Sequence, residues 1–245
     1  MSGNQPDPPT AAQVVERLVD LAAPGGPTKS SGSFRCDNPD EQFLGVPMRD
    51  VFAVAKQFAA LEPEQVEQLL NSPVHEVRVA AVSVMDAQAR RRSTPATRRQ
   101  ELYELYLRRH DRIDNWDLVD RAAPSVVGGY LCDRPRDPLY DLARSADPMR
   151  RRTAITATYH FLQRGQTEGT FAVAELLAAD SHDLVQKAVG GWLREAGKHD
   201  RNRLLAFFDA HAPSMARIAV RYAVEHLDSA SRRHYRTLTR PATTS

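Results

Sequence analysis

Apolar residues recur every three or four positions along most of this chain, which is the spacing of one face of an α-helix. The first such segment covers residues 11–23, where five aliphatic side chains share a face. A second runs from residue 48 to about residue 60, and comparable segments follow to the C-terminal region. The alternation of apolar and polar positions that is typical of β-strands does not occur. The pattern therefore predicts an all-α fold.

Short turn-forming segments divide the chain into predicted helices of roughly ten to eighteen residues. The turns contain Pro, Asn, Ser or Asp, at residues 71–73, 93–95, 146–148, 180–182 and 212–214. Residues 24–42 are rich in Gly, Pro and Ser and are predicted to form a long loop. We expect one domain over residues 11–235, a disordered tail over residues 1–10 and a flexible tail over residues 236–245.

A short motif recurs in helices that follow these turns. It consists of a basic or long polar residue, then a small residue, then a β-branched one, at residues 77–82, 151–155, 185–189 and 217–220. Arg152 and Lys187 lie 35 positions apart, and the segment around Trp116 falls between Arg78 and Arg152 at a similar interval. This period, with two helices per unit, predicts a HEAT-like helical-repeat solenoid with a concave groove.

The basic residues of the motif have two interpretations. They can form a stripe along the groove, which would suit a polyanionic partner. They can also form a ladder of ion pairs with acidic residues of neighbouring repeats and bind nothing else. The spacing alone leaves both interpretations open.

The composition is that of an ordinary globular protein, with 42% hydrophobic and 26% charged residues. The net charge is only +2, although most basic residues are Arg, which binds phosphate well and is also favoured by a GC-rich genome. Cys36 and Cys132 form no metal or redox spacing and suggest a reducing compartment. No apolar run approaches membrane-spanning length. We therefore expect a cytoplasmic protein with no membrane partner.

The common catalytic motifs are missing from the sequence. The histidines form no zinc-type pair, and there is no Gly-rich phosphate loop or nucleophile-elbow Ser. We therefore expect no metal and no cofactor. What remains is the segment 115–120 (NWDLVD), where Trp116 and Asp120 stand one turn apart on a predicted helix. The pair is either an aromatic wall beside a reactive carboxylate, or a core Trp with a salt-bridged Asp.

Several segments, taken in order, resemble the AlkD-like DNA alkylation repair family, which are HEAT-like-repeat DNA glycosylases. No single segment is specific, but their order and spacing together are, across about residues 40–230. The matching segments are 43–46 (FLGV), 115–120 (NWDLVD), 152–155 (RTAI), 185–190 (VQKAVG) and 193–198 (LREAGK).

The resemblance implies a monofunctional DNA glycosylase of base excision repair that removes cationic N3- or N7-alkylated purines without base flipping. Asp120 would be the catalytic carboxylate, Trp116 the aromatic wall beside it, and Arg152 the arginine that approaches the DNA backbone at the lesion. The partner would be double-stranded DNA, bound by a monomer that associates with the nucleoid. The remaining DNA-binding residues would be Arg151, Lys187, Trp192, Arg194, Lys198 and Arg221.

The chain departs from the family pattern at three places. The family's second cleft aromatic aligns with Gly191, whereas here Trp192 stands one position later, about 100° around a helix. Met149 stands where relatives usually have Trp, and residues 34–36 (FRC) match poorly. Two alternatives to an enzyme remain, a catalytically silent relative that binds DNA structures and a scaffold for a protein partner. The shifted aromatic residue favours the catalytically silent relative, and the weak net charge favours the protein scaffold.

Overall fold

The computed structural model describes residues 8–22 and 41–238. Within these ranges the chain is helical, and the only bridge outside the helices joins Gln42 to Val74, which confirms the all-α prediction. The predicted loop as far as residue 40, the segment 34–36, and residues 1–7 and 239–245 of the two predicted tails lie outside the described residues. In the part of the chain that is described, no helix has the length and apolar character that crossing a bilayer requires.

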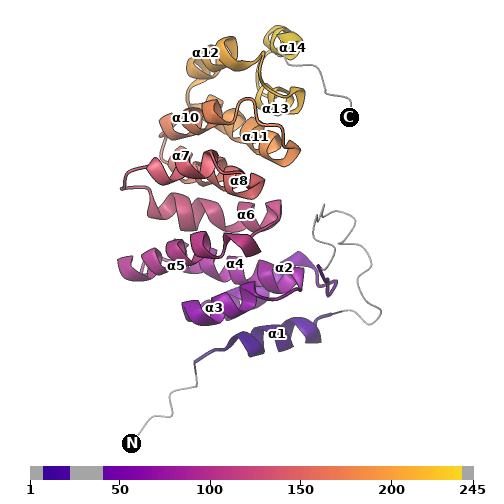
Figure 1. Ribbon diagram of the computed structural model, residues 1–245, viewed down its shortest axis with the longest axis vertical. Coiled ribbons are helices and arrows are strands. Elements are labelled where there is room, and N and C mark those ends of the chain that lie inside the picture. Colours follow the sequence, from indigo (N-terminus) through magenta and orange to yellow (C-terminus); the bar gives the residue numbers. More distant parts are fainter. Residues whose placement is uncertain (1–7, 23–40, 239–245) are drawn as a thin grey trace, which may run out of the picture. The chain divides into compact units, whose positions relative to one another are not determined.

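The chain divides into two compact units, residues 1–126 and residues 127–245, which we describe separately. Helix α4 is the centre of the first unit, because it packs against α2 on one side and α6 on the other, while α3 and α5 contact it from a second layer (Figure 1). Fourteen of its residues are buried, so α4 supplies much of this unit's core. The helices are α1 (Ala11–Asp20), α2 (Met48–Gln57), α3 (Pro63–Leu70), α4 (His75–Arg90), α5 (Ala96–Arg108) and α6 (Trp116–Ala123).

The second unit repeats this two-layer arrangement. Helices α8, α11 and α13 contact one another in series, and α7 contacts α10 in the other layer. The recurring motif lies in α4, α8, α11 and α13, which hold corresponding places in the two units, so the predicted helical repeat is confirmed. The helices are α7 (Asp137–Ala143), α8 (Pro148–Ala157), α9 (Tyr159–Leu162), α10 (Glu168–Leu176), α11 (Asp183–His199), α12 (Arg201–His211), α13 (Arg217–Ala223) and α14 (Ser229–Leu238).

Several helix boundaries differ from the predicted ones. Helices α1 and α2 end before residues 23 and 60, and many helices are shorter than ten residues, α9 having only four. At the C-terminal end, α14 continues to Leu238, past the predicted domain boundary at residue 235. Buried Tyr235 stacks on Phe208 and so holds this last helix to the unit. The predicted flexible tail therefore begins inside a helix.

Gly190 allows α11 and α13 to approach closely. A Cβ atom at this position would lie 2.3 Å from the carbonyl oxygen of Ala219 and 2.9 Å from its Cα. Because both are backbone atoms, they cannot move aside as a flexible side chain would. Gly191, the next residue, has open space where its Cβ would lie.

Candidate active site

Helix α6 divides into a buried side and an accessible side. Its accessible residues, all partly exposed, are Trp116, Asp117, Asp120 and Arg121. At 100° per residue they cover one arc of the helix, and Asp120 lies near the middle of that arc. Trp116 lies one turn before Asp120 on the same side. The fully buried residues are Leu118, Val119, Ala122 and Ala123.

The first turn of α6 is fixed by polar contacts. Asn115, the N-cap residue, accepts a hydrogen bond from the backbone N–H of Trp116 at 2.8 Å. The residue before it, Asp114, pairs with a guanidinium nitrogen of Arg78 at 2.6 Å. Asp117 accepts a hydrogen bond from His75 at 2.7 Å. Because both partners belong to α4, the start of α6 is tied to the central helix of the unit.

His75 lies between two carboxylates. Its Nδ1 is 2.6 Å from Oε1 of Glu41 and its Nε2 is 2.7 Å from Oδ2 of Asp117, while the ring packs 5.3 Å from that of Phe43. A carboxylate oxygen accepts a hydrogen bond, so both ring nitrogens must carry a proton and His75 is an imidazolium cation. Burial opposes this charge, but the hydrogen bonds to Asp117 and Glu41 outweigh it and raise the pKa of His75 to about 9.

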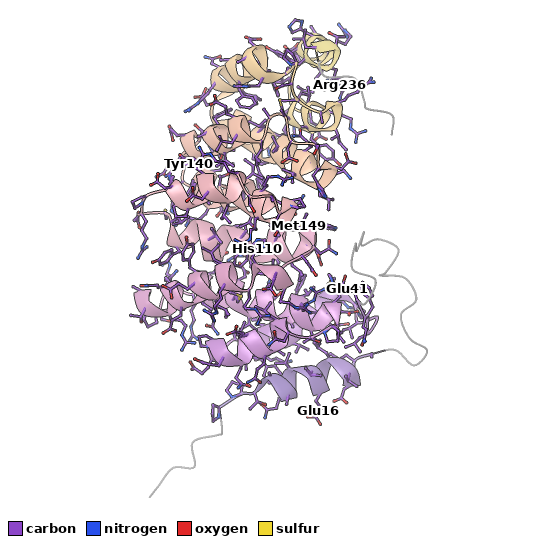
Figure 2. The ribbon with its side chains drawn as sticks, in the orientation of Figure 1. Glu16, Glu41, His110, Tyr140, Met149 and Arg236 are labelled. Carbon is purple, nitrogen blue, oxygen red and sulfur yellow. The ribbon has the colours of Figure 1, made fainter. Side chains whose placement is uncertain are left out.

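Arg78 completes this buried network. It forms ion pairs with Glu41 and Asp114 and donates to the carbonyl of Arg112 at 3.1 Å. Burial would raise the pKa of Glu41, but the hydrogen bond from His75 and the charge of Arg78 hold that pKa below its ordinary value. Glu41, labelled in Figure 2, therefore joins both cations of α4. We call Glu41, His75, Arg78, Asp114 and Asp117 the α4–α6 charge network.

Glu76 holds the segment 43–46 beside this network. Its buried carboxylate accepts hydrogen bonds from the backbone N–H groups of Leu44, at 3.0 Å, and Gly45, at 2.8 Å. Gly45 has φ 76°, a left-handed conformation that glycine adopts without steric cost. The FLGV segment is therefore fastened to the start of α4, next to His75.

The second turn of α6 is fixed through Arg121. Its Nε donates to Oγ of Ser83 at 3.0 Å, and its Nη2 lies 3.5 Å from a carboxylate oxygen of Asp86. Its guanidinium stacks 4.5 Å from the ring centroid of Phe52 on α2. Asp86 also accepts a hydrogen bond from Ser125, just after α6. Contacts at both turns therefore set the rotation of α6 about its own axis, and with it the direction of Asp120.

In the second unit, the basic residues at the start of α8 are engaged within the protein. Arg151 donates to both carboxylate oxygens of Asp180, at 2.5 and 3.3 Å, and to the carbonyls of Ser145 and Ala146. Arg152 is only 7% exposed and donates to the carbonyl of Leu184. Both side chains thus join one repeat to the next.

At the motif position, Arg78 of α4 reaches the following repeat in the same way, whereas Gln186 of α11 reaches back to the end of α10. Arg78 of α4 donates to the carbonyl of Arg112, and the amide of buried Gln186 in α11 donates to the carbonyl of Leu177 at 2.8 Å. Arg78 and Arg151 pair with carboxylates of the following repeat, as the ladder interpretation proposes, whereas Arg152 donates to a carbonyl of that repeat. The described structure uses Arg78, Arg151 and Arg152 to hold repeats together.

Three of the predicted DNA-binding residues share a face of α11. Lys187, Arg194 and Lys198 follow one another at helical spacing, and Gly191 lies on the same face. Arg194 pairs with Glu225 on the next repeat, and Lys198 is 2.7 Å from Glu195. On α13, Arg221 is exposed.

Trp192 packs against the preceding repeat. Its Nε1 donates to Oγ1 of Thr156 at 3.2 Å, and its ring lies 4.8 Å from that of Tyr159. The ring is therefore on a different side of α11 from Gly191, as the one-residue shift in the sequence predicts. Met149, also labelled in Figure 2, is 5% exposed and belongs to the core.

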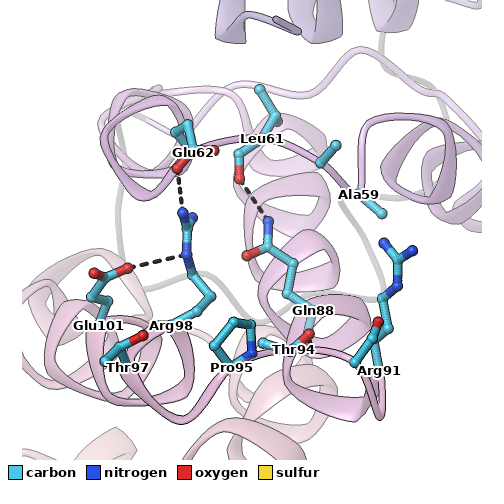
Figure 3. A pocket seen from close by; sticks show the side chains of 12 residues that line it. Ala59, Leu61, Glu62, Gln88, Arg91, Thr94, Pro95, Thr97, Arg98 and Glu101 are labelled. Atoms are coloured by element: carbon cyan, nitrogen blue, oxygen red, sulfur yellow. Dashed lines mark hydrogen bonds and ion pairs between the residues drawn. The ribbon is translucent and has the colours of Figure 1, made fainter.

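A cavity of about 320 Å³ opens at the other end of α4 (Figure 3). It is lined in part by Gln88, which donates to the carbonyl of Leu61, and by Arg98, which pairs with Glu62 and Glu101. Gln88 follows His75 by thirteen residues, or about 20 Å of helix. The cavity is therefore separate from the accessible side of α6.

The comparisons with known proteins can be set against this geometry. The family model for DNA alkylation repair enzymes matches residues 14–227. The chain belongs to the DNA alkylation repair enzyme family. This family membership gives the protein a role in the repair of alkylation damage, with DNA as its partner. Both the α6 site and the α11 face lie inside the matched range, whereas α14 begins after its end.

A solved structure supports the same fold. The chain is similar to a protein described as a predicted DNA alkylation repair enzyme from Enterococcus faecalis, with a TM-score of 0.59 and 15% sequence identity. The similarity covers 78% of this chain and 90% of the other. At this identity it shows the helical-repeat fold shared by members of the DNA alkylation repair enzyme family. No curated protein matches the chain.

Proposed function

We propose that the protein is a monofunctional DNA glycosylase that excises cationic N3- or N7-alkylated purines from double-stranded DNA. The observation that supports this most is the placement of Trp116 and Asp120 on the accessible side of an α6 whose rotation is fixed by buried contacts. The family membership supports DNA as the substrate. We expect the enzyme to act as a monomer in the cytoplasm, at the nucleoid.

The chemistry explains how one carboxylate can suffice. A purine alkylated at N3 or N7 already carries a positive charge, so it leaves without protonation by a general acid. The N-glycosidic bond breaks, its electron pair passes to the base and neutralises it, and the sugar becomes oxocarbenium-like. The Asp120 carboxylate stabilises that cation. Water then adds to C1′ and loses a proton, which leaves an abasic site.

Trp116 would act on the same charges from one turn away. An indole face beside a desolvated cation contributes about 1–2 kcal/mol of attraction. Because Trp116 and Asp120 lie on one accessible arc, the lesion need not enter a closed pocket. We therefore propose excision without base flipping, in contrast to most enzymes that react with a DNA base. Such a site would also accept bulky adducts.

The other predicted residues take different parts in this proposal. Arg152 is buried and bound to Leu184, so we propose that it positions α11 instead of touching DNA directly. Lys187 and Lys198, on one face of α11, would contact phosphates, as would Arg221. These contacts would attract the DNA and position the protein along the duplex, whereas the reaction itself would take place at α6.

Release of the base from defined duplexes tests the proposal. The substrates carry 7-methylguanine or 3-methyladenine, and wild type is compared with Asp120→Asn under single-turnover conditions. We expect wild type to release the base and Asp120→Asn to be slower by at least 100-fold, since losing one preorganised electrostatic group typically costs that much. Asp133→Asn is the control for loss of one negative charge, because Asp133 is exposed and lies outside α6 and the charge network, and it should leave excision near the wild-type rate.

Two results would count against the proposal in different ways. If wild type releases neither methylated base nor a bulkier N3 or N7 adduct, the protein is not a glycosylase of this class. If wild type and Asp120→Asn release base equally fast, the activity stands but the assignment of Asp120 is wrong.

A second candidate function is DNA binding without catalysis. It is favoured by the open space at Gly191 and by the packing of Trp192 against Thr156 and Tyr159, which leave the α11 face without an aromatic ring at these two positions. A silent relative would bind duplex DNA with a steep salt dependence and release no base.

A further inference from the structure

Helix α14 lies beyond the range that the family model matches and carries an unusual charge. Its sequence, SASRRHYRTL, contains Arg232, Arg233 and Arg236 and no acidic residue. Over residues 217–238 five arginines face two acidic residues, a net charge of +3, whereas the rest of the chain sums to −1, since the total is +2. The net positive charge of the protein is therefore concentrated at its C-terminal end. The low total charge conceals this asymmetry.

The two acidic residues of this segment are engaged. Glu225 pairs with Arg194, and Asp228 pairs with Arg201 at 3.0 Å and accepts two hydrogen bonds from Ser231. The hydrogen bond from Arg194, together with its charge, holds the pKa of Glu225 below its ordinary value, so Glu225 stays ionised in that pair.

Helix α14 is also held firmly in place. Tyr235 is its one buried residue, and the Tyr235 hydroxyl donates to Asp209 at 2.9 Å while its ring lies 5.0 Å from that of Phe208. At the other end, the hydrogen bonds from Ser231 to Asp228 cap the helix. The arginines therefore project from a fixed support, which limits the entropy lost when they bind a ligand.

The arginines of α14 lie away from its anchor. Arg233 and Arg236 are exposed, and Arg232 is partly exposed (Arg236 is labelled in Figure 2). They span four residues, about 6 Å of helix axis. The exposed side of α14 has no aromatic residue and one large apolar residue, Leu238, which is too little to insert into a bilayer. Planar guanidinium groups bind phosphate oxygens in pairs of hydrogen bonds.

We propose that α14 is a second DNA-contacting surface, in which Arg232, Arg233 and Arg236 bind backbone phosphates of duplex DNA independently of base identity. This inference rests on the proposed function for its choice of DNA as the polyanion. Phosphate contacts of this kind position the duplex and carry no sequence information. The surface would therefore strengthen binding to undamaged and damaged DNA alike.

The test compares two variants that lose the same charge. In the first, Arg232, Arg233 and Arg236 are replaced by Gln; in the control, the exposed Arg134, Arg144 and Arg164 of the same unit are replaced by Gln. Affinity for an undamaged fluorescent duplex is measured by anisotropy between 50 and 200 mM salt. If all three α14 arginines bind phosphates, the slope of log affinity against log salt falls by about 2.7, so the loss of affinity across this range is about 40-fold smaller.

The outcomes are distinct. The proposal predicts the reduced slope for the α14 variant, a near wild-type slope for the control, and a near wild-type slope when the three residues are replaced by Lys, which keeps the charge. If the triple Gln variant fails to fold, replacing only the exposed Arg233 and Arg236 by Gln tests the proposal, with an expected fall in slope of about 1.8. Equal losses in the two Gln variants, or no loss in either, would overturn it. So would weakened binding of the α14 variant to phosphatidylserine vesicles with unchanged binding to DNA. Because this assay uses undamaged DNA, failure of base release by wild type would refute the proposed function separately.

Discussion

The protonated His75 at the centre of the α4–α6 charge network makes a specific prediction about stability and pH. A group whose pKa is higher in the folded state than in the unfolded state stabilises the fold. This stabilisation is fully present at pH values below the unfolded pKa, and it is lost as the pH rises through the folded pKa. For His75 these values are 6.5 and about 9. The difference corresponds to about 3 kcal/mol of folding free energy, present at pH 6 and lost by pH 10.

The perturbation is His75→Gln, which retains a hydrogen-bonding side chain but cannot take a charge. Urea unfolding of wild type and variant is measured at several values between pH 6 and pH 10. We expect the free energy of unfolding of wild type to exceed that of the variant most at pH 6. This difference should shrink by about 3 kcal/mol toward pH 10. Replacing the exposed His199 by Gln is the matched control and should leave the pH dependence of wild type unchanged.

The other charged groups around His75 do not produce this signature. Glu41 on the preceding segment has a lowered pKa and stays charged over the whole range. Tyr235, whose pKa is raised by burial and by Asp209, is present in both proteins, so its titration cancels in the difference. A difference in unfolding free energy that is constant from pH 6 to pH 10 would refute the charged state that we assign to His75.

Three further predictions concern single substitutions. Replacing Trp116 by Ala should slow base release about 5- to 30-fold in single-turnover assays, because about 1–2 kcal/mol of cation–π attraction is lost. Replacing it by Phe should retain part of the rate. An unchanged rate in the Ala variant would show that Trp116 has only a structural role. Gly190→Ala should destabilise the fold by about 1–3 kcal/mol in urea titrations because the new Cβ meets the backbone of α13, whereas Gly191→Ala should stabilise it by about 0.5–1 kcal/mol; equal effects would contradict the packing described. Gly45→Ala should cost about 1–2 kcal/mol because φ is 76° there, and an unchanged urea midpoint would show that the turn relaxes.

The fold was largely predictable because helices of a repeat show their buried faces as a period in the sequence. The motif of α4, α8, α11 and α13 is visible in the sequence, and each copy lies in a corresponding helix. Helix ends were less predictable. Helix α14 runs on to Leu238 because Tyr235 finds Phe208 and Asp209, residues that are distant in sequence. A local pattern does not contain that contact.

The charged residues could not be interpreted from the sequence in the same way. A pattern shows on which side of a helix an arginine lies but not whether a carboxylate from another repeat reaches it. Arg78 and Arg151 each form an ion pair with a carboxylate about thirty or more positions away, and both ion pairs connect neighbouring repeats. The role of His75 is hidden in the sequence, because its two carboxylate partners, Glu41 and Asp117, lie 34 and 42 positions away. The paired carboxylates Asp114 and Asp117 around Trp116 were the available signal for a buried cation.

The charge network explains how a short helix can hold a reactive carboxylate accurately. Helix α6 has eight residues, and only Leu118 and Val119 among its buried side chains are large, so apolar packing constrains its rotation weakly. A functional group must be held to within about 10–20° of its productive orientation. Successive residues of a helix point about 100° apart, so the choice of residue alone sets this direction too coarsely, and the rotation of the helix must also be fixed. The hydrogen bond from His75 to Asp117 is directional, and Asp117 lies three residues before Asp120 on the same accessible side of α6. We infer that these buried, directional ion pairs and hydrogen bonds, more than apolar packing, fix the direction of Asp120.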